Sequence, residues 1–125
     1  MKRLVFESWL ILLYFDFMMR LRDFKSLHSF VRNIKVRARS ADMSISSTEL
    51  CRAMDLACVF YFKRVLCLQR SAATTLLLRR HGRRAEMVIG VQVVPFRSHA
   101  WVETDGAIVN DKPYMLDIYS VLERC

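Results

Sequence analysis

Apolar and polar residues follow a helical period in the first two thirds of the chain and a strand period after it. Over residues 4–30 the apolar positions recur every three or four residues, which predicts helix, either in one piece or in two. A basic stretch over residues 31–40 and a polar run over residues 41–47 follow, and we expect a linker there.

Two further helices are predicted in the middle of the chain. Ser46 and Glu49 have the spacing of a capping box, in which the serine accepts a backbone N–H, so a helix should run from there to about residue 62. Another helix should run over residues 67–80, because Gly82 follows at a position where a left-handed residue often ends a helix.

The last part of the chain has the signals of a sheet. Residues 86–94 are rich in β-branched side chains, which predicts a largely buried strand that ends at Pro95. The segments "HAWVE" (99–103) and "AIVND" (107–111) flank a turn and predict a β-hairpin. Helices followed by an antiparallel sheet form an α+β fold.

Length and composition bound the organisation of the protein. The chain has 125 residues, 54% of them apolar, with three glycines and two prolines, which fits one ordered domain. We expect residues 1–45 to form a helical extension that packs on the core or on a partner, and residues 46–125 to form the core. The apolar run 9–19 is too short to span a bilayer and contains Asp16, so stable membrane insertion is not expected.

The charge is unevenly distributed. Of the net charge of +8, six units lie before Ser40, where nine basic residues stand against three acids, and this favours an acidic partner or surface. The basic residues are spread over several elements without a concentrated recognition helix, so no nucleic acid is expected as a partner.

Four cysteines are present, Cys51, Cys58, Cys67 and Cys125, without C-x-x-C pairs or histidines at metal-ligand spacing. We therefore expect no metal and no cofactor, and in so apolar a chain no disulfide framework, which favours a cytoplasmic protein. Cys51 and Cys58 lie seven residues apart on one helical face, where buried packing is the expected role.

Cys67 differs because it stands where a helix begins. The unpaired N–H groups and the positive end of the helix dipole favour a thiolate there, and Arg70 could add to the same field. The same N–H groups can hold an oxyanion on an attacked carbonyl. The alternative is a buried cysteine that only packs.

A thiolate nucleophile needs a base, which is normally histidine. His28 lies among basic residues, and His81 stands at a helix C-terminus, where an imidazolium suits the dipole. His99 opens a predicted strand and is the candidate base. The alternative for His99 is an imidazole that is satisfied by a backbone carbonyl.

The length of the hairpin loop decides which residue faces His99. With a two-residue turn, Thr104 would oppose Ala107, and His99 and Asp111 would point to opposite faces. With a three-residue loop ending in a left-handed Gly106, His99 would oppose Asp111, and the carboxylate could fix the tautomer of the imidazole. The alternative for Asp111 is a turn residue that ends the strand.

The order and spacing of these residues resemble a known family. Residues 67–111, "CLQRSAATTLLLRRHGRRAEMVIGVQVVPFRSHAWVETDGAIVND", are similar to the core of the transglutaminase-like B protein, the leader peptidase of lasso-peptide biosynthesis. The shared features are C-L-x-R-S opening a helix, a leucine-rich helix that ends near Gly82, "IGV", "PF-x-x-HAW" and a closing "ND". The helix expected over residues 48–62 matches more loosely.

The resemblance implies a papain-like or transglutaminase-like cysteine peptidase core, with Cys67 as nucleophile, His99 as base and acid, and Asp111 as the residue that orients the imidazole. Family members cut the leader from a precursor peptide, and an ATP-dependent cyclase then closes the macrolactam. The residues before Ser46 read as helical and not as the β-rich leader-recognition domain that some members carry. The resemblance therefore implies the stand-alone form, which needs a separate leader-recognition protein.

Two other functions stay open at this point. The same three residue types serve acyltransferases of the transglutaminase-like class, in which an amine replaces water as the acceptor. A non-catalytic scaffold of the biosynthetic complex is the third interpretation.

Overall fold

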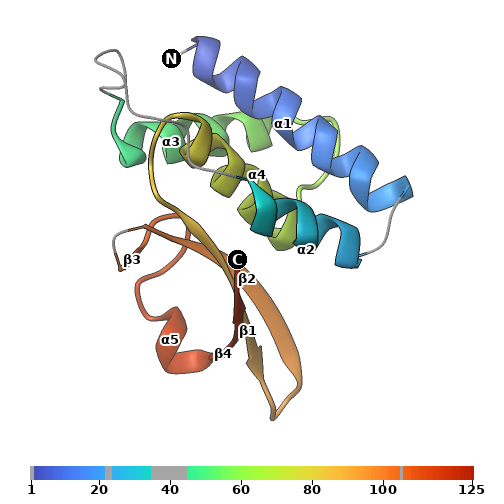
Figure 1. Ribbon diagram of the computed structural model, residues 1–125, viewed down its shortest axis with the longest axis vertical. Coiled ribbons are helices and arrows are strands. Elements are labelled where there is room, and N and C mark those ends of the chain that lie inside the picture. The colour runs from blue at the N-terminus through green and yellow to red at the C-terminus, as the bar shows by residue number, and fades with distance from the viewer. Residues whose placement is uncertain (1, 22–23, 35–44, 105) are drawn as a thin grey trace.

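The computed structural model describes residues 2–21, 24–34, 45–104 and 106–125 (Figure 1). The helices α1 (Lys2–Leu21) and α2 (Phe24–Asn33) come first, and α3 (Ser47–Phe60) and α4 (Cys67–Arg80) follow. An antiparallel sheet in the order β3-β2-β1-β4 and one short helix complete the fold, with the bounds β1 (Glu86–Gln92), β2 (Arg97–Thr104), β3 (Ala107–Ile108), α5 (Met115–Ile118) and β4 (Ser120–Arg124). The expected α+β fold is confirmed.

The local signals for α3 and α4 act as the sequence predicts. The side chain of Ser46 accepts the N–H of Glu49 at 3.2 Å, so α3 begins at its predicted cap. At the end of α4, Gly82 has a φ of 77°, and the N–H of Arg83 donates to the carbonyl of Leu78 at 2.9 Å. This bond, which spans five residues, is typical of a Schellman motif, and the motif requires a left-handed residue at the end of the helix.

Helix α4 is the central helix, because it packs against α1, α3 and β2. Two of its buried polar residues are satisfied within the helix, since the hydroxyls of Thr74 and Thr75 donate to carbonyls one turn earlier, at 2.7 and 2.9 Å. The apolar residues that α4 buries completely are Ala72, Ala73, Leu77 and Leu78. Few positions of α4 are therefore left for contact with solvent.

The sheet separates a large core from a small one. On β2, Ala100 and Val102 face the helical core, whereas Trp101 faces the opposite side. There Trp101 packs with Val88 of β1 and Met115 of α5 in a second cluster. Figure 1 shows the four longer helices gathered together, with α5 apart from them beside β4.

Helix α1 belongs to the large core through Leu12 and Phe15, which are fully buried. The carboxylate of Asp16 is also buried and accepts hydrogen bonds from Tyr61 at 2.8 Å and Lys63 at 2.7 Å. Burial acts to raise the pKa of Asp16, but Lys63 and Tyr61 together hold it below its ordinary value. Within the described ranges, no helix has the length and apolar character needed to cross a membrane.

The outer side of α1 is apolar as well, with spacings of three and four residues along the whole helix. We call this surface the outer stripe, and it consists of the exposed residues Phe6, Leu10, Tyr14, Phe17 and Leu21. The boundary predicted at residues 45–46 follows directly on residues 35–44, which lie outside the described residues, and it stays a prediction.

Arg79 joins segments that are distant in the sequence. Its buried guanidinium donates to Val31 and Ile34 at the end of α2, to Ala85 just before β1, and to Cys125 after β4. These carbonyls are removed from water and need a donor. The sequence did not predict this role, because a cation in the last turn of a helix is normally exposed.

The end of the chain also differs from expectation. Strand β1 ends at Gln92, two residues before the predicted end, and α5 and β4 were not predicted at all. The side chains of β4 are mostly exposed, so its sequence lacks the alternating pattern that marks a half-buried strand. It is held by pairing with β1, where Val88 opposes Arg124.

We predict that Arg79→Met lowers the free energy of unfolding by about 2–4 kcal/mol, because buried carbonyls lose their donor. Chemical denaturation measures this change. The control is Arg80→Met: the Arg80 side chain is 53% exposed and lies 3.9 Å from Glu7, so its loss should cost less than about 1 kcal/mol. Equal losses in the two variants would contradict the proposed role of Arg79.

Candidate active site

Cys67 is the first residue of α4, and its side chain is exposed. Leu66 precedes it in an extended conformation and has no side-chain acceptor to cap the helix. The first N–H within the helix to find a main-chain partner is that of Arg70, which donates to Leu66 at 2.9 Å. The N–H groups of residues 67–69 are therefore left to stabilise negative charge beside the sulfur.

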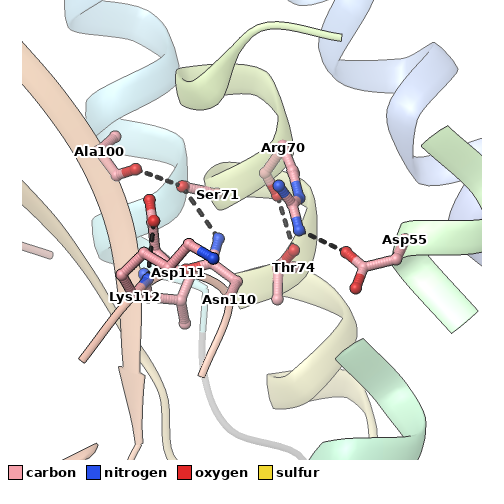
Figure 2. A network of polar contacts seen from close by, with 9 residues as sticks. Asp55, Arg70, Ser71, Thr74, Ala100, Asn110, Asp111 and Lys112 are labelled. Atoms are coloured by element: carbon pink, nitrogen blue, oxygen red, sulfur yellow. Dashed lines mark hydrogen bonds and ion pairs between the residues drawn. The ribbon is translucent and has the colours of Figure 1, made fainter. Parts of the chain in front are cut away.

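Arg70 does not direct its charge to Cys67 alone. Its guanidinium lies 2.5 Å from the carboxylate of Asp55 on α3, as Figure 2 shows. This ion pair offsets part of the positive field that the sequence led us to expect at Cys67, and it links α4 to α3.

His99 and Asp111 are in direct contact. Nε2 of His99 lies 2.5 Å from Oδ2 of Asp111, and both side chains are about three quarters buried. The other carboxylate oxygen accepts the N–H of Lys112 at 2.8 Å, which fixes its orientation. Because a carboxylate only accepts, Nε2 carries the hydrogen and Nδ1 is left to accept a proton.

Two aromatic side chains pack against the imidazole of His99. His99 stacks on Tyr119 with ring centres 5.5 Å apart, and Trp101 lies 6.2 Å away. Gly90 on β1 pairs with His99, and a Cβ there would come within 2.6 Å of Trp101 and 2.8 Å of Tyr119. A side chain at position 90 would thus push these rings apart. The sequence signal for this role is the single glycine in a β-branched strand.

The three-residue hairpin loop that would place Asp111 opposite His99 is wrong. Strand β3 pairs Ala107 with Thr104 and Ile108 with Glu103, which is the register of a two-residue turn. Continued along the strands, this register would put Asp111 opposite Ala100. Gly106 does adopt a left-handed φ of 79°, but two-residue turns also require this, so the glycine could not decide the register.

Asp111 reaches His99 because the chain leaves the ladder. The N–H of Val109 donates to the carbonyl of Val102 at 3.0 Å, but the return bond is not made to the main chain. Instead, the N–H of Val102 donates to Oδ1 of Asn110 at 2.7 Å. After Asn110 the chain no longer follows β2, and it places Asp111 against the imidazole of His99.

Measured along the direction of β2, the first residues of α4 lie at about the same height as His99. Ser71, one turn after Cys67, donates its hydroxyl hydrogen to the carbonyl of Ala100 at 3.0 Å (Figure 2). Arg79, further along α4, reaches Ala85, beside the end of β2, so helix and strand run in the same direction. Since four helical residues span about 6 Å and a strand residue about 3.3 Å, one turn before Ser71 corresponds to residues 98–99.

Cys67 and His99 are not hydrogen-bonded to each other in the described part of the chain. The strand alternation turns His99 to the side of Trp101, away from the helical core. In the described residues β3 pairs only with Glu103 and Thr104 of β2, and beyond this pairing Asp111 lies against His99.

The other three cysteines lie in positions where burial makes their thiols less reactive. Burial raises the pKa of Cys51 to about 11, with a further contribution from Asp55, and burial also raises the pKa of Cys58 and of Cys125. Among the described residues no group of three His, Cys, Asp or Glu side chains could hold a metal ion.

Two hollows lie beside α3, and Asp55 borders both. One of about 400 Å³ reaches Ile108 and Val109, and one of about 360 Å³ reaches Val65, two residues before Cys67. A larger hollow of about 530 Å³ lies at the other end of α4, beside Arg79. None of these three hollows is lined by Cys67, His99 or Asp111.

The model of the transglutaminase-like superfamily matches residues 10–124, and the chain belongs to that superfamily. A stretch of 56 residues is 45% identical to the microcin J25-processing protein McjB of Escherichia coli. That stretch covers 45% of this chain and 27% of the relative's length. No solved structure matches the chain. The two matches confirm the resemblance recognised from the sequence.

We predict that an alkylating reagent at pH 8 labels Cys67 before the other three cysteines. At this pH a thiol with a pKa of about 11, such as that of Cys51, is ionised in about one molecule in a thousand, and only the thiolate reacts. Mass spectrometry of a labelling time course measures the order. In guanidinium all four thiols should react alike, and Cys51 labelling as fast as Cys67 in native protein would contradict the assignment.

Proposed function

We propose that this protein is a cysteine peptidase that removes the leader from a lasso-peptide precursor. The contact that carries the proposal is the 2.5 Å hydrogen bond between His99 and Asp111, at the level of the helix that Cys67 opens. Membership of the transglutaminase-like superfamily and the similarity to a peptide-processing protein support it.

The chemistry would begin at Cys67. Its sulfur attacks the carbonyl carbon of the leader's last residue, and Nδ1 of His99 takes the thiol proton. The N–H groups at the start of α4 hold the oxygen that becomes negative. The imidazolium then gives its proton to the departing amine of the core peptide, which leaves an acyl-enzyme that carries the leader.

Water completes the reaction. His99 removes a proton from a water molecule, the hydroxide attacks the thioester, and the sulfur leaves with the proton restored to it. Asp111 keeps the hydrogen on Nε2 throughout, so that Nδ1 can accept and donate. No metal or cofactor takes part in these steps. We place the reaction in the cytoplasm, where a catalytic thiol stays reduced.

The partners proposed are the precursor peptide, a separate leader-recognition protein and the ATP-dependent cyclase that closes the ring. The outer stripe of α1 is the surface proposed for the recognition protein. The acids of α1 are turned inward, Glu7 to His81 and Asp16 to Tyr61 and Lys63. The exposed charged side chains of α1 are accordingly basic, Lys2, Arg3 and Arg20, which favours an acidic, amphipathic partner segment.

We predict that Cys67→Ala and His99→Ala abolish leader release while leaving the fold intact. Asp111→Asn should reduce the rate by roughly 10³–10⁴, because the tautomer is no longer fixed while the nucleophile remains. Precursor, recognition protein and each variant are incubated together, and the products are weighed. Cys58→Ala, at a half-buried thiol on α3, is the matched control and should keep full activity.

The products distinguish the alternatives. Free leader with one added water supports the peptidase, whereas a leader joined to an added amine would make the protein an acyltransferase. Normal leader release by Cys67→Ala would contradict catalysis at this site and leave a scaffold.

We predict that Leu10→Glu with Phe17→Glu weakens binding of the recognition protein at least tenfold, because both side chains belong to the outer stripe. Titration calorimetry measures the affinity. Leu122→Glu on β4, at a position 66% exposed, is the control and should bind as the unchanged protein does. Unchanged affinity of the double variant, or binding of the unchanged protein to lipid vesicles alone, would contradict a protein-docking role.

A further inference from the structure

We propose that Asn110 is a positioning residue, which holds Asp111 on His99 and ties both to the helix that begins with Cys67. The catalytic part of this inference rests on the proposed peptidase function. The geometric part does not, since it concerns contacts among Asn110, Ser71 and β2.

The side chain of Asn110 bridges three parts of the fold. Oδ1 accepts the N–H of Val102 on β2 at 2.7 Å, and Nδ2 donates to Oγ of Ser71 on α4 at 3.2 Å. Ser71 in turn donates to the carbonyl of Ala100 at 3.0 Å. Figure 2 shows Ser71 between Ala100 and Asn110, with Asp111 next along the loop.

The chemistry of the partners fixes the orientation of the amide. A backbone N–H can only donate, so the atom facing Val102 has to be the oxygen of Asn110. The amide nitrogen then faces Ser71, whose hydroxyl gives its hydrogen to Ala100 and can accept one from Asn110. Asparagine meets both requirements, whereas aspartate offers no donor and alanine offers neither group.

The bond to Val102 decides where Asp111 goes. In a regular antiparallel pair, Val102 and Val109 would exchange two main-chain bonds, and the ladder would lead Asp111 towards Ala100. Only the bond from Val109 to Val102 is made, because Asn110 takes the other. The last main-chain bond between the strands is therefore made by Val109, two residues before Asp111, and the carboxylate of Asp111 contacts His99 instead of following the ladder.

The hydrogen bond from Asn110 to Ser71 connects the loop to α4. Ser71 lies one turn after Cys67 on α4, so a contact at Ser71 sets the distance between the start of α4 and the loop. Asn110 thus couples the proposed nucleophile to the histidine and carboxylate pair without touching substrate. This is the work of a positioning residue.

The geometric test uses nuclear magnetic resonance on the Cys67→Ala chain with labelled histidine. The Nε2–H proton of His99, held by Asp111, should give a downfield signal that exchanges slowly with water. We expect Asn110→Ala to speed this exchange at least tenfold and Asn110→Asp, which keeps an acceptor for Val102, to speed it less. Asn33→Ala, at an exposed asparagine on α2, is the matched control and should leave the signal unchanged.

The catalytic test measures leader release by the full-length protein with its recognition partner. Misplacement of a catalytic group by about 1 Å costs roughly 100-fold in rate. We therefore expect Asn110→Ala to lower kcat by about this factor while KM changes less than about twofold, and Asn110→Asp to recover part of the rate. Ser71→Ala should lower kcat with the Nε2–H signal of His99 preserved.

The outcomes separate the two proposals. If neither the unchanged protein nor any variant releases leader, but Asn110→Ala still alters the His99 signal, the peptidase function is contradicted and the positioning role is supported. If Asn110→Ala leaves both the signal and kcat within twofold of the unchanged protein, the positioning role is overturned. Should Asn110→Ala not fold, the comparison of Asn110→Asp with Asn33→Ala decides in the same way.

Discussion

The guanidinium of Arg79 connects the end of α2, the chain before β1 and the end of β4 by donating to carbonyls of all three. The bonds to Ala85 and Cys125 are buried, where an acceptor without a donor is costly. Because Arg79 lies in the last turn of α4, it attaches one end of this helix to the sheet and to α2. An α-helix is rigid over this length, so the position of its other end follows. The placement of Cys67 beside β2 thus depends on an interaction at the far end of the same helix.

Three kinds of element carry the residues of the candidate site, and each contributes what the others lack. The start of α4 contributes unpaired N–H groups beside an exposed sulfur. Strand β2 contributes His99, held between Tyr119 and Trp101 where Gly90 leaves room. The loop after β3 contributes a carboxylate. Burial raises the pKa of the other three cysteines, whereas the thiol of Cys67 is exposed at the start of α4.

The shortness of β3 is a functional feature in this interpretation. A longer β3 would pair with β2 beyond Glu103 and cover the edge at His99. The amide of Asn110 stops the ladder while satisfying Val102, so the strand can end without leaving a buried N–H unpaired.

The sequence by itself determined the four longer helices, the strand β1 and the residue that opens α4. The cap at Ser46, the left-handed Gly82 and the position of Cys67 depend on neighbours within one helical turn, and a local pattern records such contacts. It also indicated His99 and Asp111 as partners, although by a hairpin register that is wrong.

Only the tertiary structure decided how those partners meet. Arg79 takes its carbonyls from three distant segments, β4 is a strand because β1 offers an edge, and Asp111 reaches His99 because Asn110 binds Val102. None of these contacts has a period or a fixed spacing in the sequence. Each depends on which surfaces lie together after folding, and local residue patterns carry no information about that.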